Sequence, residues 1–224
     1  MLGKYLLCNL FSLMIASSVT VATQEKTRNV WEQQYRDRSA AEMAAQFESP
    51  TRPVYRHRAD IVELLQLKPG MSVAEIGAGS GFLSLLIAEK VLPSGKVIAT
   101  ELDEKMVLFM NDRARRHQLT NFRAIRGQTA STGLAPASLD AITLVNTYSF
   151  FDRPDDMLRS IKKSLKPSGL LLIVDFPRTG QGAQAEGLSP DDVRATVVKA
   201  GFEYLDNSSV VPGHYALRFR SMRR

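Results

Sequence analysis

The stretch VAEIGAGSGF, residues 73–82, places three glycines two positions apart directly after a short apolar run. The apolar run at 71–76 predicts a strand, and residues 81–90 predict a helix. Glycine at such a strand-to-helix turn adopts positive φ and lets a ligand approach the backbone closely. Open parallel sheets bind ligands beyond the carboxyl ends of their strands, so this turn is the first candidate for a binding site. A tight turn that binds nothing is the alternative that the stretch alone leaves open.

The remainder of the chain alternates strand-like and helix-like segments. Further strands are predicted at 96–101, 122–127, 139–146 and 169–175, with helices at 104–117 and 155–165. A helix begins at Ser189 and ends at Gly201, and two strands at 202–206 and 214–220 follow it without an intervening helix. This order indicates an α/β three-layer sandwich whose seven-strand sheet is mostly parallel, with the last strand reversed in an antiparallel pair at the sheet edge.

A lead-in of different character, residues 23–67, precedes this domain, which we place at 68–224. The segment 23–50 is polar and alanine-rich and predicts one or two short helices before a proline-containing break. Apolar residues then recur along 55–67, which predicts a helix with one buried face. The fold therefore carries an N-terminal helical segment that could act as a lid.

The first 22 residues differ in composition from the rest of the chain. One lysine, Lys4, precedes a mostly apolar run over 5–22 that ends in small residues. This pattern is typical of a secretory signal peptide, with an uncleaved membrane anchor as the alternative. We therefore expect an exported protein, periplasmic or secreted, or one held on a membrane; a catalytic domain that faces the cytosol stays open. Removal of the segment takes away Cys8, the only cysteine, so the mature chain holds no disulfide and no thiolate ligand.

Composition narrows the choice of partner. The 224 residues are 44% hydrophobic and 23% charged with a net charge of +6, which is typical of a globular protein with a solvated basic surface. The arginine-rich stretch at 113–116 has no interleaved aromatic residue to stack on bases, and the stretch at 218–224 has one, Phe219. A nucleic acid is therefore a secondary candidate partner, and the sequence leaves the oligomeric state open.

A carboxylate ends the second predicted strand. Glu101 lies about 20 residues beyond the glycines, where an acid in this fold accepts hydrogen bonds from a ribose diol. The glycine register has Phe82 where a dinucleotide fingerprint needs its third glycine. Glu75, two residues before the first glycine, suits a cationic, amino-acid-bearing ligand better than a pyrophosphate.

These motifs resemble those of a known family. VAEIGAGSGF and VIATELDEKM are similar to the first two motifs of the class I S-adenosylmethionine (SAM)-dependent methyltransferases. The segment LDAITLVNTYSFFDRPDDMLRSIKKSLKPSGLLLIVDF, residues 139–176, resembles the fourth and fifth strands of the type 11-like, small-molecule branch. The lead-in FESPTRPVYRHR, residues 47–58, resembles that of an exported-looking subgroup. The similarity covers nearly all of residues 60–220 and is specific to cofactor and fold, not to the methyl acceptor.

The resemblance implies a set of cofactor-binding residues. They are Glu75, Gly77, Ala78, Gly79, Gly81, Glu101, Leu102, Gln128 and Asn146. By this resemblance Glu75 and the glycines line the methionine end of SAM, with Gly81 supporting the turn. Glu101 holds the ribose hydroxyls, and Leu102 packs against adenine. Gln128 stands where many relatives carry an acid for the adenine amino group, and Asn146 faces the sulfonium.

Methyl transfer from SAM does not require the protein to supply a covalent nucleophile. The cofactor carries an activated methyl group, so the protein aligns acceptor, methyl and sulfur and excludes water, and we expect no metal. Tyr148, after the fourth predicted strand, is the first candidate for a catalytic contact with the acceptor. His57 is the second, as an acid or base. Glu48 and Arg52 either pair and fold as a lid or stay solvated.

The leading prediction is methyl transfer from SAM to a small-molecule or lipid-like acceptor, by in-line displacement. Methylation of RNA or protein, docked through the basic surface, is one alternative. A non-catalytic protein that binds SAM is another. Membrane association through the N-terminus follows if the apolar leader is not cleaved.

Overall fold

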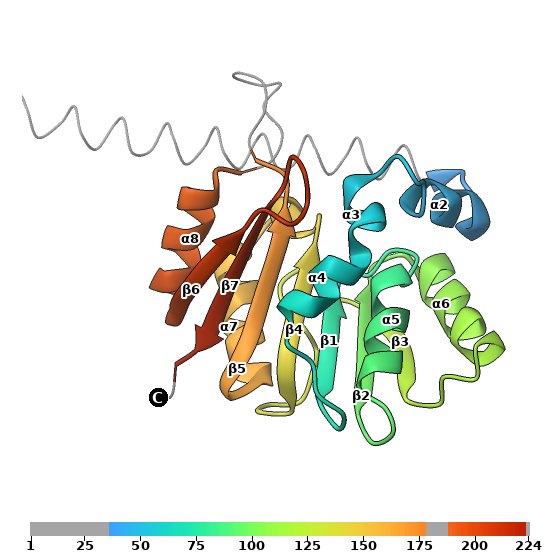
Figure 1. Ribbon diagram of the computed structural model, residues 1–224, viewed down its shortest axis with the longest axis horizontal. Coiled ribbons are helices and arrows are strands. Elements are labelled where there is room, and N and C mark those ends of the chain that lie inside the picture. Colours follow the sequence, from blue (N-terminus) through green and yellow to red (C-terminus); the bar gives the residue numbers. More distant parts are fainter. Residues whose placement is uncertain (1–35, 178–187, 223–224) are drawn as a thin grey trace, which may run out of the picture.

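The computed structural model describes residues 36–177 and 188–222 (Figure 1). The predicted leader at 1–22 and the first part of the lead-in, 23–35, lie outside the described residues. Within the described part of the chain, no helix is long and apolar enough to cross a membrane.

Seven strands form one sheet in the order β3-β2-β1-β4-β5-β7-β6. The strands are β1 (Ser72–Ile76), β2 (Lys96–Glu101), β3 (Phe122–Arg126), β4 (Leu139–Val145), β5 (Leu165–Asp175), β6 (Phe202–Ser208) and β7 (Tyr215–Ser221). Neighbours from β3 to β5 run parallel, and β7 runs antiparallel to both β5 and β6. The predicted mostly parallel sheet with a reversed last strand is confirmed, and the antiparallel β6–β7 pair lies at the sheet edge as predicted, with β6 outermost.

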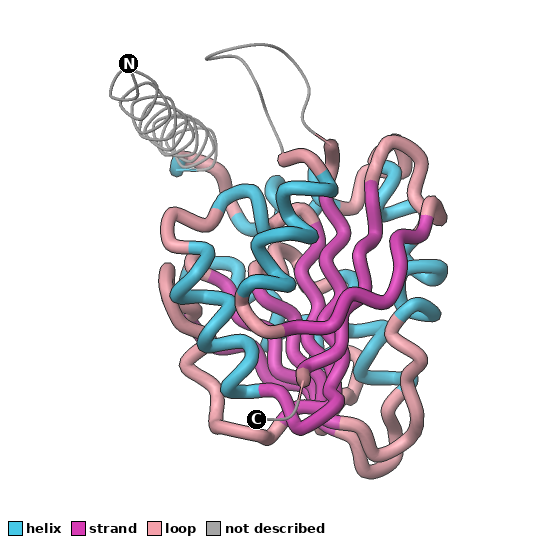
Figure 2. Tube along the Cα trace, turned by 90° about the vertical axis from the view of Figure 1, so that its left-hand side faces the viewer, coloured by secondary structure: helices cyan, strands magenta, loops and turns pink. Residues whose placement is uncertain are grey.

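Helices cover both faces of this sheet. They are α2 (Ala40–Phe47), α3 (Pro53–Arg56), α4 (Arg58–Leu64), α5 (Phe82–Lys90), α6 (Glu104–Arg116), the 3-10 helix η1 (Tyr148–Phe150), α7 (Pro154–Ser164) and α8 (Pro190–Lys199). Helices α4, α5 and α6 pack on one face, and α7 and α8 pack on the other. Figure 2 shows the strands between the two helical layers, as the predicted three-layer sandwich requires.

Two large apolar clusters, separated by the sheet, make up most of the core. Successive residues of β1 alternate between them: Val73 belongs to the cluster under α4–α6, while Ala74 and Ile76 belong to the cluster under α7 and α8. A central parallel strand that is covered on both faces reads as a continuous apolar run, which is the pattern in this part of the sequence. Glu75 interrupts that run and is only 2% exposed, so its carboxyl needs a specific partner.

Two boundaries differ from the prediction. The helix expected over 55–67 is two helices, α3 and α4, which meet at His57. Proline at the first helical position makes α3 begin earlier, at Pro53, because its fixed φ suits that position. β5 begins at Leu165 instead of 169 because Leu165 already pairs with Leu139 of β4.

Helix α2 fastens the lead-in to the main domain. Ser39 and Glu42 form a capping box at its start, which satisfies backbone donors that the first turn leaves free. Met43 and Ala44 then pack against Met106 of α6. The helix is therefore held by an apolar contact as well as by its own cap.

An ion pair completes this attachment. Glu48 binds Arg113 of α6 through both guanidinium nitrogens, with Nη2 3.0 Å from Oε2. Arg52, the partner expected for Glu48, donates Nη1 to the Phe47 carbonyl at 2.9 Å. Glu48 therefore ties the lead-in to α6, and the predicted Glu48–Arg52 pair is replaced by Glu48–Arg113.

The glycine turn between β1 and α5 needs glycine for two reasons. Gly77 and Gly81 have φ of +72° and +75°, in the left-handed region that most side chains avoid. In addition, a Cβ at Gly77 would lie 2.4 Å from the side chain of Thr147. The predicted strand-to-helix turn is confirmed, and Gly77 also allows the end of β4 to approach it closely.

Gly77→Ala should therefore destabilise the protein more than Gly213→Ala. Gly213 has the same φ, +72°, but a Cβ there meets nothing within 4 Å. Substitution of Gly213 should lower the free energy of unfolding only by the cost of a side chain at positive φ, roughly 1–2 kcal/mol. The collision with Thr147 adds roughly 1–3 kcal/mol at Gly77. Urea unfolding of the two variants measures the difference, and equal losses would show that the approach of Thr147 imposes no constraint.

Candidate functional site

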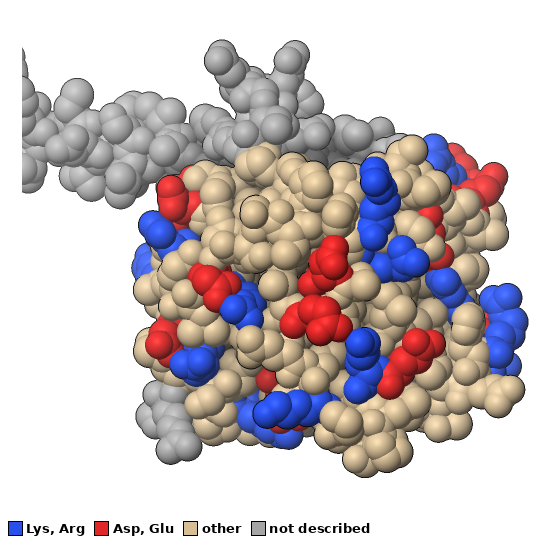
Figure 3. Space-filling model, in the orientation of Figure 1, with Lys and Arg blue, Asp and Glu red and all other residues tan. Residues whose placement is uncertain are grey.

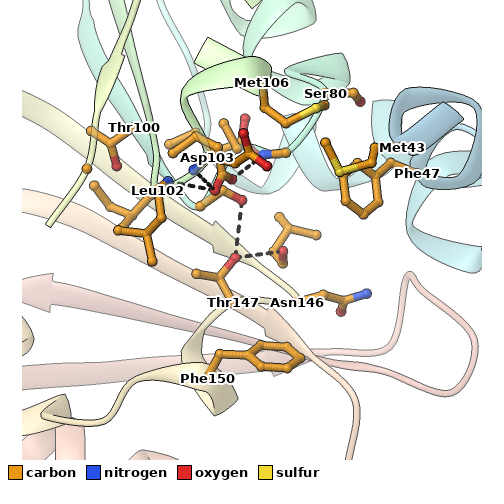
Figure 4. A pocket seen from close by; sticks show the side chains of 18 of the residues that line it. Met43, Phe47, Ser80, Thr100, Leu102, Asp103, Met106, Asn146, Thr147 and Phe150 are labelled. Carbon is orange, nitrogen blue, oxygen red and sulfur yellow. Dashed lines mark hydrogen bonds between the residues drawn. The ribbon is translucent and has the colours of Figure 1, made fainter. Parts of the chain in front are cut away.

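A cavity of about 550 Å³ opens at the carboxyl ends of β1, β2 and β4. The strand order reverses between β1 and β4, which is the position where open α/β sheets bind ligands. Met43 and Phe47 of α2 line the cavity from the lead-in (Figure 4). Its volume is typical of sites for small molecules and cofactors.

The first wall is the glycine turn, which is bonded to the end of β2. The N–H groups of Gly77 and Ala78 both donate to the Thr100 carbonyl, at 2.8 and 3.0 Å. The N–H of Gly79 donates to Oε2 of Glu101 at 2.9 Å. The turn and the second strand therefore form one rigid edge of the cavity.

Glu101 is fixed at that edge by backbone donors. Its Oε1 accepts from the N–H of Leu102 at 2.6 Å and from the N–H of Asp103 at 3.3 Å. Burial raises the pKa of Glu101, and the backbone hydrogen bonds oppose that rise. An ionised carboxylate has about four lone-pair sites, so acceptor capacity is left for a ligand hydroxyl.

Glu75 is the second buried acid of the cavity. Ser84 Oγ of α5 donates a hydrogen bond to its Oε2. Burial raises the pKa of Glu75 to about 8, and the bond from Ser84 opposes the rise. The carboxyl is therefore protonated at neutral pH unless a cation lies beside it. A ligand with an ammonium group would supply that cation.

The end of β4 forms the opposite wall. Asn146 lines the cavity with φ of +50°, and its buried Oδ1 has no hydrogen-bond partner among the described residues. Thr147 Oγ1 is 3.1 Å from the Val145 carbonyl and 3.3 Å from the Gly77 carbonyl, which links this wall to the glycine turn (Figure 4). Buried polar atoms are rarely left unpaired, so the Asn146 oxygen marks a place for a ligand donor.

Apolar side chains line much of the remaining cavity. They are Met43, Phe47, Val54, Phe82, Phe150, Phe151 and Phe176. Asp152 also lines the cavity, after η1. We name Phe150, Phe151, Asp152 and Phe176, which follow the carboxyl ends of β4 and β5, the acceptor half.

A buried carboxylate aligns two loops of the acceptor half. Asp175, at the end of β5, is fully buried. Its Oδ2 accepts from the Ser149 N–H at 3.1 Å, and its Oδ1 accepts from the Phe176 N–H at 2.9 Å. Burial raises the pKa of Asp175 to about 6. One side chain thus sets the positions of the loops that carry Phe150 and Phe176.

The structure brings most of the predicted cofactor residues together. Those that line the cavity are Glu75, Gly77, Ala78, Gly79, Glu101, Leu102, Gln128 and Asn146. Gly81 is not among the lining residues; it is the N-cap of α5, in the left-handed conformation. Its place supports the turn, and the individual contacts of the other residues with SAM stay predictions.

Neither predicted catalytic residue lines the cavity. Tyr148 is 2% exposed and packs edge-on against Phe151 with ring centres 5.7 Å apart, because η1 turns its ring into the core cluster beneath α7. His57 Nδ1 lies 2.8 Å from Asp60 Oδ2 in the lead-in. Neither side chain lines the cavity in this structure, whereas Phe150 does.

The sequence pointed to the lead-in, with Arg52, as a possible lid, but it did not identify Phe47 or Phe176 as lining residues. Phe47 and Arg52 of the lead-in, and Phe176 after β5, all line the cavity. Only the lead-in carried a signal, the resemblance of FESPTRPVYRHR to that of other methyltransferases. In residues 36–177 and 188–222, no three His, Cys, Asp or Glu side chains are grouped to hold a metal ion.

Comparisons with known proteins agree with the site. Residues 67–203 match the family described as a methyltransferase domain. A ubiquinone/menaquinone biosynthesis C-methyltransferase, UbiE, of Legionella pneumophila (strain Lens) is 31% identical over 116 residues, 51% of this chain and 46% of that protein. A demethylmenaquinone methyltransferase of Listeria welshimeri is 26% identical over 120 residues, 53% of this chain and 50% of that protein.

A solved structure of another protein has a similar fold. The crystal structure of a SAM-dependent methyltransferase from Aquifex aeolicus superposes with a TM-score of 0.70 at 21% identity, covering 80% of this chain and 98% of that one. Fold and site together define a class I SAM-dependent methyltransferase, as the sequence predicts. The chain belongs to the methyltransferase-domain family, since the match spans more than half of its length. It spans about half the length of the curated relatives named above.

The residues present fit SAM as the cofactor. The buried Glu75 suits the cationic methionine end, and the unpartnered oxygen of Asn146 can accept from its ammonium group. Glu101 offers a fixed acceptor for the ribose diol. Leu102 is 48% exposed and offers apolar surface against which adenine can pack.

The affinity for S-adenosylhomocysteine, the demethylated product of SAM, should rise as pH increases from 6 to 8. The pKa of Glu75 is about 8 in the ligand-free protein, and a bound ammonium group favours the ionised form, so binding releases a proton below that pH. The dissociation constant falls by up to about tenfold per pH unit and levels off near pH 8. Calorimetry in buffers of different ionisation enthalpy measures the proton released.

Glu75→Gln is the control for this pH dependence. The variant should bind more weakly and release no proton from this site. Equal proton release by the variant and the unaltered chain would assign the titration to another group.

Proposed function

We propose that this protein transfers the methyl group of SAM to a small, largely apolar, ring-bearing acceptor. The observation that carries the proposal is that one cavity is lined both by polar groups suited to SAM and by phenylalanines. The bound cofactor supplies the methyl group as an electrophile. The S–CH₃ bond breaks with its electron pair left on sulfur as a bond from the acceptor to carbon forms.

The chain itself positions the reactants and keeps water out. Glu75, Glu101 and Asn146 fix the cofactor on one side. Phe150 and Phe176 cover the acceptor on the other side, and Asp175 positions the two loops that carry them. Excluding water strengthens the electrostatic contacts inside the site and prevents solvent from competing with the acceptor. Where the acceptor atom carries a proton, we assign its removal to Asp152, the carboxylate of the acceptor half.

The names of the relatives support an acceptor of this kind. The proteins of Legionella pneumophila and Listeria welshimeri are named for ubiquinone/menaquinone biosynthesis and for demethylmenaquinone. A quinol-like ring would suit the aromatic walls, because aromatic rings stack edge-on or offset against one another. The acceptor of this chain is therefore proposed as a hydroxylated ring with an apolar substituent.

The charge distribution favours this acceptor over RNA. Arg113 of α6 binds Glu48, and Arg115 and Arg116 both bind Asp112. Figure 3 shows basic and acidic side chains interspersed over the face that carries α4, α5 and α6. A surface of mixed sign gives weak attraction for a polyanion, which binds through concentrated positive charge.

Calorimetric binding of SAM to the full chain, followed by transfer of a labelled methyl group, tests the proposal. Glu101→Ala should weaken SAM binding about tenfold to a hundredfold, because it removes charged hydrogen bonds to the ribose. Glu104→Ala is the matched control: it removes a neighbouring acid that is exposed on α6. The variants should bind SAM with clearly different affinities.

Label should then move to hydroxylated rings with an apolar tail and not to RNA or peptides. Transfer to RNA alone would establish the alternative acceptor. Tight SAM binding without transfer to any acceptor would leave a non-catalytic SAM-binding protein. No binding of SAM by the folded chain would refute the proposal altogether.

We further propose that residues 1–22 direct the protein to the membrane, as a cleaved export signal or as an anchor, in keeping with the exported-looking subgroup. The support is the sequence alone: one lysine, an apolar run and small residues at its end. Fractionation of cells that express the full chain, with N-terminal sequencing, should find it exported after cleavage or in the membrane fraction. Leu6→Arg combined with Leu7→Arg should leave it in the cytosol. An unaltered chain found intact and free in the cytosol would contradict this.

A further inference from the structure

Two of the described residues that line the cavity are basic, Arg36 and Arg52, and the transfer step proposed above uses neither. The two arginines lie toward different ends of the cavity. Lys105 Nζ donates to the Arg36 carbonyl at 3.2 Å, which places Arg36 at the first turn of α6, near Leu102 and Asp103. Arg36 is therefore at the end of the cavity that suits ribose and adenine.

Arg52 lies against the glycine turn instead. Its Nη1 donates to the Phe47 carbonyl at 2.9 Å, and its guanidinium carbon is 5.5 Å from the centre of the Phe47 ring. The ring lies over Gly79, since a Cβ on that glycine would be 3.2 Å from it. Arg52, Phe47 and Gly79 thus form a continuous stack above the turn that follows Glu75.

The charge of Arg52 also reaches the wall beyond β5. Burial lowers the pKa of His214, and the charge of Arg52 lowers it further. The His214 ring meets Phe176 edge-on with ring centres 6.4 Å apart, and Phe176 lines the cavity. The guanidinium therefore lies over the cavity between the glycine turn and the end of β5.

The methionine moiety of SAM carries two opposite charges on one carbon, an ammonium and a carboxylate. Glu75 suits the ammonium. The ligand carboxylate would lie near the carboxyl group of Glu75 without compensation unless a cation lies beside it. Arginine suits that role, because its planar donors match the two oxygens of a carboxylate.

We infer that Arg52 binds the carboxylate of the methionine moiety of SAM, so that the lead-in completes a site that the glycine turn begins. This assignment rests on the proposed function. Arg52 precedes residue 67, where the match to the methyltransferase-domain family starts, so the segment outside the matched region supplies one of the cofactor contacts. Arg52 and Glu75 then hold the two opposite charges of one amino-acid group.

Calorimetry on the full chain with two ligands tests the assignment. The ligands are S-adenosylhomocysteine and its decarboxylated form, which keeps the ammonium and lacks the carboxylate. Arg52→Gln should weaken the first about tenfold to a hundredfold and leave the second within about twofold. Arg36→Gln removes the other lining arginine and is the matched control. It should change the affinities for the two ligands by the same factor. Arg52→Lys keeps the charge and should recover part of the loss.

The outcomes are distinct. An equal loss for both ligands in Arg52→Gln would mean that Arg52 only positions Phe47, and it would overturn the assignment. Unchanged binding of both ligands would overturn it as well. Failure of the proposed function gives a different result, in which the unaltered chain binds neither ligand. Undiminished binding of the decarboxylated ligand shows at the same time that the variant is folded.

Discussion

The hydrogen bond from the Gly79 N–H to Glu101 Oε2, 2.9 Å long, joins the two strand ends on which the site depends. It holds the first turn of the fold against the second strand while both groups line the cavity. The end of β4 also approaches this turn closely and requires glycine at 77, because the Thr147 side chain fills the space where a Cβ would stand. A cofactor wall made of backbone is rigid, and a rigid wall can hold a methyl donor in line with an acceptor without reorganising during transfer.

The acceptor half is built differently from the cofactor wall, because it is assembled from segments far apart in the sequence. Helix α2 reaches the cavity from the lead-in, over the glycine turn, and is kept there by the Glu48–Arg113 pair and by the contact of Met43 with Met106. Phe176 reaches it from the end of β5 through Asp175. Specificity for the acceptor can therefore change without disturbing the cofactor wall, which is consistent with one fold serving many acceptors.

Much of the fold could be read from the sequence, and the successes and failures have physical causes. The alternation of buried strands and one-faced helices predicted the sheet and its reversed last strand, since periodicity reflects burial directly. The predicted helix boundary near His57 and the predicted start of β5 were wrong because a proline start and a strand pairing outweighed the local pattern. Tyr148 was expected at the acceptor, but a single turn of 3-10 helix places its ring in the core, together with Phe151, and leaves Phe150 to line the cavity.

The sequence by itself determined the class of ligand: a glycine register with Phe82 in place of a third glycine, Glu75 before it and Glu101 about 20 residues after it. These residues lie close in sequence or at the ends of adjacent strands, so local pattern places them together. Only the tertiary structure decided which residues close the cavity. Phe47, Arg52 and Phe176 meet there because packing, not sequence spacing, brings the lead-in and the end of β5 over the glycine turn, and long-range packing has no local signature.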